Sequence, residues 1–130
     1  MITGWIQSSD FSDRNLGNLD ADQAIAQFQN HDWDSEFKQE NKLKNQGNES
    51  CPAGIGFNAD KGDLHICPEG GSINLVLFNY QIPKKIFGII PTSSHISKTR
   101  DGVPDKMCHQ LIRLFFLGEY DALIQEMSRQ

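Results

Sequence analysis

The sequence predicts an α+β domain in which an antiparallel four-stranded meander carries helices from both ends of the chain on one face. Three observations predict this class. Apolar residues recur at helical spacing near both ends, they alternate with polar residues in the middle, and turn-forming residues separate the alternating runs. The 130 residues show no internal repeat and no break in composition, so we expect a single domain over residues 1–130.

Two helices are expected in the N-terminal third of the chain. Asp20 is suited to cap the first helix, and Gln23 stands where it completes a capping box. This helix is predicted to end near Asn30, with an apolar stripe at i, i+3, i+4 and i+7 formed by Ala21, Ala24, Ile25 and Phe28. Asp34 is expected to cap a second helix that runs to about Gln46. Because that segment has few apolar residues, it should project into solvent or fray.

The first two strands of the meander are predicted to form a hairpin. Residues 55–59 and 64–67 alternate between apolar and polar positions, and residues 60–63 (Asp-Lys-Gly-Asp) form a turn sequence between them. The expected register places Phe57 opposite Ile66 and Ala59 opposite Leu64. All the apolar residues of the hairpin then share one face.

The next segments complete the predicted sheet. Residues 73–80 are apolar on both faces and should form a central strand. A turn at residues 83–85 leads into a fourth strand at residues 86–90, which Pro91 closes. Residues 92–102 are polar and are expected to form a long loop.

The two ends of the chain follow from the same rules. Residues 1–18 are expected to be a loop or short strand pinned by three apolar anchors, Trp5, Ile6 and Phe11. Pro104 or Asp105 should start a helix that reaches Leu117. A last helix over residues 119–127 should follow, with its inward side formed by Tyr120, Leu123 and Ile124.

Charge is distributed unevenly along the chain, whose formal net charge is −5. Residues 10–40 hold eight acids against Arg14 and Lys38, a net charge of −6, whereas residues 84–106 hold five bases against two acids, a net charge of +3. The acidic third disfavours nucleic acid as a partner. It either steers a basic protein partner or is a solvated surface of uneven charge.

The sequence also indicates where in the cell the protein is found. The N-terminal residues show no signal peptide, and the longest apolar runs are far shorter than the roughly 18 residues of a membrane span. The three cysteines are odd in number and widely spread, unlike a disulfide framework. We therefore expect a cytoplasmic protein with no membrane partner.

No catalytic, cofactor-binding or metal site is predicted. A zinc interpretation draws on Cys51, His65, Cys67, Cys108 and His109, but their spacing contains neither C-x-x-C nor H-x-x-x-H. The glycines near residues 54–56 and 69–71 do not form a phosphate loop. A small hydrolase that pairs Cys51 or Cys67 with His65 remains an alternative hypothesis.

The candidate binding surface lies in the acidic third. Its members are Asp20, Asp22, Asp32, Trp33, Asp34, Glu36 and Glu40. Trp33 is either an interface anchor ringed by steering charge or a cover for the core edge between two helices. Helix capping is a second explanation for the four aspartates.

Short strings in the sequence resemble small immunity proteins of bacterial polymorphic-toxin systems, the antidotes to contact-dependent and type VI secreted toxins. These strings are CPAGIG at residues 51–56 and LHICP at residues 64–68, followed by an amphipathic C-terminal helix. The resemblance, which also covers size and acidity, implies a non-enzymatic cytosolic protein that occludes a toxin domain, often a basic nuclease. It transfers no site residues. An adaptor or chaperone for a secreted protein is an alternative, and the oligomeric state stays open.

Overall fold

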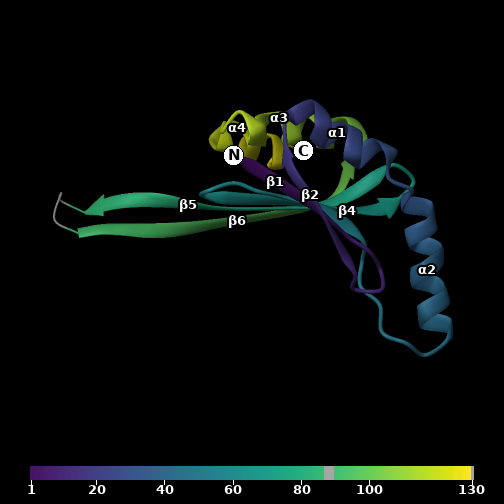
Figure 1. Ribbon diagram of the computed structural model, residues 1–130. Helices are drawn as coiled ribbons and strands as arrows, with labels where there is room; N and C mark the ends of the chain where they lie inside the picture. The colour runs from purple at the N-terminus through teal and green to yellow at the C-terminus, as the bar shows by residue number, and fades with distance from the viewer. Residues whose placement is uncertain (87–89, 130) are drawn as a thin grey trace.

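A six-stranded antiparallel sheet forms the centre of the computed structural model, which describes residues 1–86 and 90–129. The strands lie in the order β2-β1-β3-β4-β5-β6 (Figure 1). Along the chain the elements are β1 (Ile2–Gln7), β2 (Asp13–Leu19), α1 (Ala21–Asn30), α2 (Trp33–Asn45), β3 (Gly54–Asn58), β4 (Gly62–Gly70), β5 (Ile73–Ile86), β6 (Ile90–Pro104), α3 (Asp105–Phe116) and α4 (Tyr120–Met127). The α+β class and the antiparallel sheet are confirmed, but the prediction of four strands is wrong.

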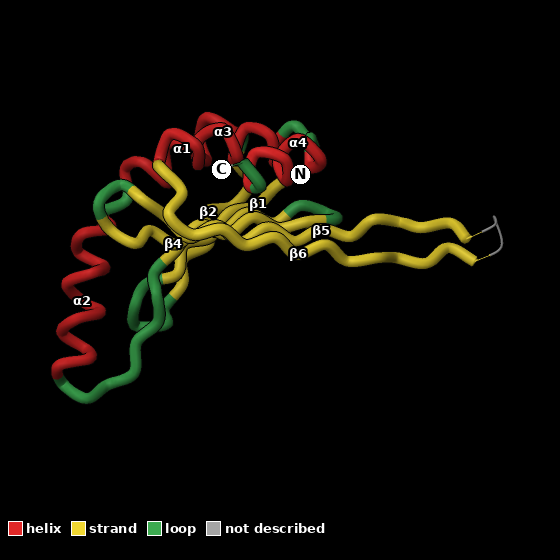
Figure 2. The backbone as a smooth tube through the Cα atoms, turned by 180° about the vertical axis from the view of Figure 1, so that it is seen from behind, coloured by secondary structure: helices red, strands yellow, loops and turns green. Residues whose placement is uncertain are grey.

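Helices α1, α3 and α4 cover one face of the sheet, as Figures 1 and 2 show from opposite sides. The core between these two layers consists of aliphatic and aromatic side chains, among which Ile55, Phe57, Leu64, Ile66, Val76, Phe78, Leu111, Ile112, Phe115 and Leu123 are fully buried. Helix α2 departs from this layer and projects past the end of the sheet. The helices predicted at the C-terminal end are confirmed as α3 and α4, but the placement of the other two at the N-terminal end is wrong, because α1 and α2 are inserted between β2 and β3.

The N-terminal segment forms a strand pair where a loop or one short strand was expected. β1 pairs with both β2 and β3, with Ile6 opposite Ile55 in the buried ladder. β2 lies at the edge of the sheet and pairs with one strand, β1. Edge strands often carry polar residues, so its sequence lacks the alternating apolar pattern that would have predicted a strand. Ile6 is buried as predicted, but Phe11 lies in the β1–β2 loop with 53% of its surface exposed and anchors nothing.

The predicted hairpin at the centre forms with a different register. Phe57 lies opposite Leu64, and Ile55 lies opposite Ile66, two positions away from the expected pairing. The cause is a longer connection, closed by the Ala59 N–H, which donates to the Gly62 carbonyl oxygen at 2.8 Å. A shift of two keeps each side chain on its face, so the apolar residues remain buried as expected.

The last two strands extend far beyond the body of the sheet. The turn predicted at residues 83–85 and the loop predicted at residues 92–102 are wrong, because both segments lie within β5 and β6. Of the strand predicted at residues 86–90, residues 87–89 lie outside the described residues. β6 is the other edge strand and needs no apolar face where nothing covers it, which explains its polar sequence.

We call residues 81–86 and 90–95 the β5–β6 arm. They pair with one another from Gln81 opposite His95 to Ile86 opposite Ile90, beyond the last pair of β4 and β5. Both views show the arm projecting away from the helices. The pairing of β4 with β5 ends before residue 81, so one edge of β5 has no neighbouring strand in the arm. Proline, which has no backbone N–H to donate, is compatible with such an edge, and Pro83 stands there.

The helix boundaries follow the sequence closely. The capping box of α1 is confirmed, with Gln23 N–H donating to Asp20 Oδ1 at 2.8 Å and Asp20 N–H donating to Gln23 Oε1 at 2.9 Å. Helix α2 is capped by Asp32, two residues before the predicted cap, Asp34. Gly118, with a φ of 73°, separates α3 from α4 as expected. Within the described part of the chain, no helix is long and apolar enough to cross a membrane.

Candidate partner-binding site

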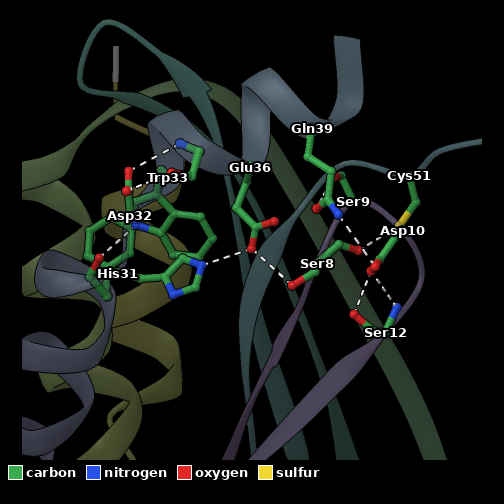
Figure 3. Close-up of polar contacts among 12 residues, drawn as sticks. Ser8, Ser9, Asp10, Ser12, His31, Asp32, Trp33, Glu36, Gln39 and Cys51 are labelled. Atoms are coloured by element: carbon green, nitrogen blue, oxygen red, sulfur yellow. Dashed lines mark hydrogen bonds and ion pairs between the residues drawn. The ribbon is translucent and has the colours of Figure 1, made fainter. Parts of the chain in front are cut away.

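One of the links between helix α2 and the body is a buried carboxylate. Glu36 is 7% exposed, and its Oε2 accepts a hydrogen bond from Ser8 Oγ at 3.0 Å and pairs with His31 Nε2 at 2.8 Å (Figure 3). Ser8 follows β1 and His31 follows α1. Glu36 therefore ties the base of α2 to the sheet and to the preceding helix.

A second group of polar contacts holds the same helix against the β1–β2 loop. Ser9 is fully buried, and its Oγ donates to Gln39 Oε1 at 2.9 Å. Cys51 Sγ donates to the Ser8 carbonyl oxygen at 3.2 Å, and the Cys51 N–H donates to the Ser9 carbonyl oxygen. In Figure 3 these groups lie together beside Gln39, on the other side of Glu36 from Trp33. Glu36 is the one buried residue of α2, so beyond Trp33 the helix is held to the body by hydrogen bonds.

Trp33, at the first position of α2, is half-buried. Its Nε1–H donates to the Phe28 carbonyl oxygen at 2.8 Å, and its ring lies 4.4 Å from the His31 ring centre and 6.3 Å from the Phe28 ring centre. The hydrogen bond fixes the indole plane, while part of the ring stays accessible. The interpretation of Trp33 as a cover for the core edge is confirmed, whereas its role as an interface anchor stays a prediction.

A groove with a volume of about 340 Å³ lies beside Trp33. We call it the junction groove. One wall is the α1–α2 junction with Phe28, Trp33 and Phe37, another is the β4–β5 turn, and a third is the start of α3 with Asp105 and His109.

The junction groove is acidic. It is lined by the carboxylates of Asp32, Asp34 and Asp105, whereas no lysine or arginine lines it within residues 1–86 and 90–129. None of these aspartates belongs to an ion pair among the same residues. Hydrogen bonds from Ser35 lower the pKa of Asp32, so this carboxyl is ionised at neutral pH.

The structure brings together three of the seven predicted binding residues, Asp32, Trp33 and Asp34. Asp20 and Asp22 lie at the opposite end of α1, roughly 15 Å along a ten-residue helix. Asp20 is used as a cap, and Asp22 forms an ion pair with Arg113 at 3.2 Å.

The other two predicted residues are engaged within the chain. Glu36 is buried, its carboxylate is engaged by Ser8 and His31, and it does not line the junction groove. Glu40 lies one turn further along and pairs with Lys44 at 2.9 Å.

Two groove residues were missed from the sequence, Asn74 and Asp105. Asn74 is 1% exposed, and its Nδ2 donates to the Val103 carbonyl oxygen at 2.9 Å and to Asp105 Oδ1 at 2.7 Å. These residues are 31 positions apart, and sequence spacing offers no signal for a contact that depends on the bulged β5–β6 pairing.

On the opposite face of the sheet, the thiol–histidine pair weighed from the sequence does form. Cys67 Sγ lies 3.4 Å from His65 Nε2, and the Trp5 ring packs 4.9 Å from the His65 ring. Burial raises the pKa of Cys67 to about 11 and lowers the pKa of His65. Both groups are therefore neutral at pH 7, and the thiolate that nucleophilic catalysis needs is scarce.

The glycines of the CPAGIG string make room for these rings. A Cβ at Gly54 would lie 2.6 Å from His65 Nε2, and a Cβ at Gly56 would overlap the Trp5 indole. Gly54 and Gly56 thus allow close packing on this face because they have no side chain. Within the described part of the chain, no group of three or more His, Cys, Asp or Glu side chains is arranged to hold a metal ion.

Comparison of the chain with protein-family models, with curated proteins and with solved structures yields no match.

Proposed function

We propose that this chain is a non-enzymatic binding protein of the cytoplasm, an immunity protein that neutralises a cognate bacterial toxin by occluding it. The observation that carries the proposal is the junction groove, where Trp33 lies among three aspartates that no cation of the groove neutralises. Aromatic side chains are common anchors of protein interfaces, and unpaired charge beside them steers a partner of opposite charge.

The mechanism proposed for this surface has two parts. The carboxylates of Asp32 and Asp34 attract a basic toxin domain and raise its association rate, an effect that salt screens. Trp33 then contributes apolar contact area at little entropic cost, because its hydrogen bond to Phe28 already holds the ring.

We expect the gene next to that of this chain to encode a toxin-like domain, and the test uses the domain expected there. Co-expression of the wild-type chain should restore growth of a bacterial host that produces this domain. The double variant Asp32→Asn, Asp34→Asn removes two charges and keeps the helix cap, since asparagine caps as well as aspartate. Its association with the purified domain should be slower at low salt and depend less on salt.

A matched variant controls for net charge. Asp60→Asn with Asp101→Asn removes the same charge at exposed positions outside the groove, and it should associate like the wild type. Failure of the wild-type chain to neutralise the neighbouring domain would refute the immunity function. An unchanged association rate in the groove variant would refute the acidic steering surface.

A further inference from the structure

We infer that the junction groove receives an arginine side chain of the partner. This inference rests on the proposed function and names the group that the groove would recognise. It follows from the charge, the aromatic wall and one unsatisfied acceptor of the same site.

The charge of the groove selects a cation. Asp32 and Asp34 stand on the wall formed by the α1–α2 junction, and Asp105 stands across from them at the start of α3. A group bound between these walls meets carboxylates on two sides. An anion would be repelled from both.

Asn74 supplies an independent indication of a hydrogen-bond donor. This side chain lines the groove and is 99% buried, and both of its amide hydrogens are used by Val103 and Asp105. Its Oδ1 accepts no hydrogen bond from any described residue. Buried polar atoms are nearly always paired, so an orphan acceptor at the base of an acidic groove indicates a ligand that donates.

A guanidinium group satisfies these features together. It carries five N–H donors in a fixed plane and no acceptor, so it can donate to the Asp105 carboxylate and, once a small rotation of the Asn74 side chain uncovers its buried Oδ1, to that oxygen as well. Its flat face also stacks on aromatic rings, and Trp33 provides a ring whose orientation is fixed. The ammonium group of lysine carries the same charge, but it has no planar array of N–H donors and no flat face to stack on Trp33.

The geometry of the β4–β5 turn keeps this site open. Gly70, Gly71 and Ser72 all have positive φ, and the Ser72 carbonyl oxygen accepts from the Asp105 N–H at 3.1 Å. The turn is thereby tied to α3 and forms a fixed wall opposite α2.

The experiment titrates the full chain with Nα-acetyl-arginine amide and follows the side-chain amide resonances of Asn74 and the indole N–H of Trp33 by NMR. Saturable shifts of both signals are expected at millimolar ligand. The neutral isostere Nα-acetyl-citrulline amide should produce none. Asp34→Asn should weaken arginine binding about two- to fivefold, as expected for the loss of one solvent-exposed charge pair, whereas Asp101→Asn should leave it unchanged.

Three results would overturn the inference: no saturable shift with arginine, equal shifts with citrulline, or tighter binding of Nα-acetyl-lysine amide. These outcomes are separable from failure of the proposed function. Neutralisation of the toxin domain without arginine binding would leave the immunity function standing and remove this occupant. Arginine binding without neutralisation of the toxin domain would support arginine as the occupant of the groove and refute the immunity function.

Discussion

Replacing Glu36 with alanine should release α2 from the body of the protein. The carboxylate is 7% exposed and holds Ser8 and His31 at 3.0 and 2.8 Å, and no other residue of α2 is fully buried. A 13-residue helix is marginal on its own in water, so its order depends on these contacts.

The size of the effect can be worked from the two hydrogen bonds. Each bond to a charged group contributes about 1.5–3 kcal/mol, and water will partly replace the lost partners at the half-buried His31. We therefore expect Glu36→Ala to cost about 2–4 kcal/mol. Because α2 touches the body at its base, much of this loss should appear as local opening.

Urea denaturation and amide hydrogen exchange measure the two contributions. The amides of α2 should exchange at least ~30-fold faster in the variant, which corresponds to about 2 kcal/mol. Glu40→Ala is the matched control on the same helix, because its pair with Lys44 is an i,i+4 pair worth about 0.3–0.5 kcal/mol. Equal effects of the two substitutions would refute the view that Glu36 anchors α2.

Three further experiments probe the sheet and the thiols beside it. Gly56→Ala should destabilise the fold by about 1–3 kcal/mol through overlap with Trp5, and the same change in a Trp5→Ala background should cost clearly less; additive free energies of unfolding would contradict this. Iodoacetamide at pH 8 should modify half-buried Cys51 before Cys67, since a pKa of about 11 leaves roughly one Cys67 thiol in a thousand ionised. The Cys67 rate should rise with pH toward that value, and rapid labelling at pH 7 would favour the thiol-hydrolase hypothesis. The β5–β6 arm projects from the body of the protein. Exchanging residues 82–94 for an Asn-Gly turn should therefore change the free energy of unfolding by less than about 1 kcal/mol. A larger loss of stability, measured by calorimetry, would show that the arm supports the core.

Features set by neighbouring residues could be predicted from the sequence, and features set by sheet position could not. The capping box at Asp20 and the break at Gly118 depend on side chains a few positions apart, and both are confirmed. β2 and β6 are edge strands, so their polar residues carry no alternating apolar signal. The even register shift at Phe57 left the buried face intact because strand periodicity is two.

The candidate site divides in the same way. Asp32, Trp33 and Asp34 are adjacent in the sequence and line the same groove. Asn74 and Asp105 also line the groove, but they are brought there by tertiary contacts that sequence spacing does not predict. Glu36 looked like a surface acid because helical acids usually are, and only the approach of the β1–β2 loop buries it.

The position of β1 between β2 and β3 also constrains how the protein assembles. Strands β3 to β6 can pair with their successors as the chain proceeds, whereas the N-terminal hairpin joins them through one ladder, from Thr3 opposite Asn58 to Gln7 opposite Gly54. Closing that ladder brings together segments separated by two helices and carries the largest entropic cost of any strand pairing in the molecule. The β1–β2 hairpin can therefore join the sheet only after β3 is available, and we expect closure of the β1–β3 ladder to be the slow step of refolding.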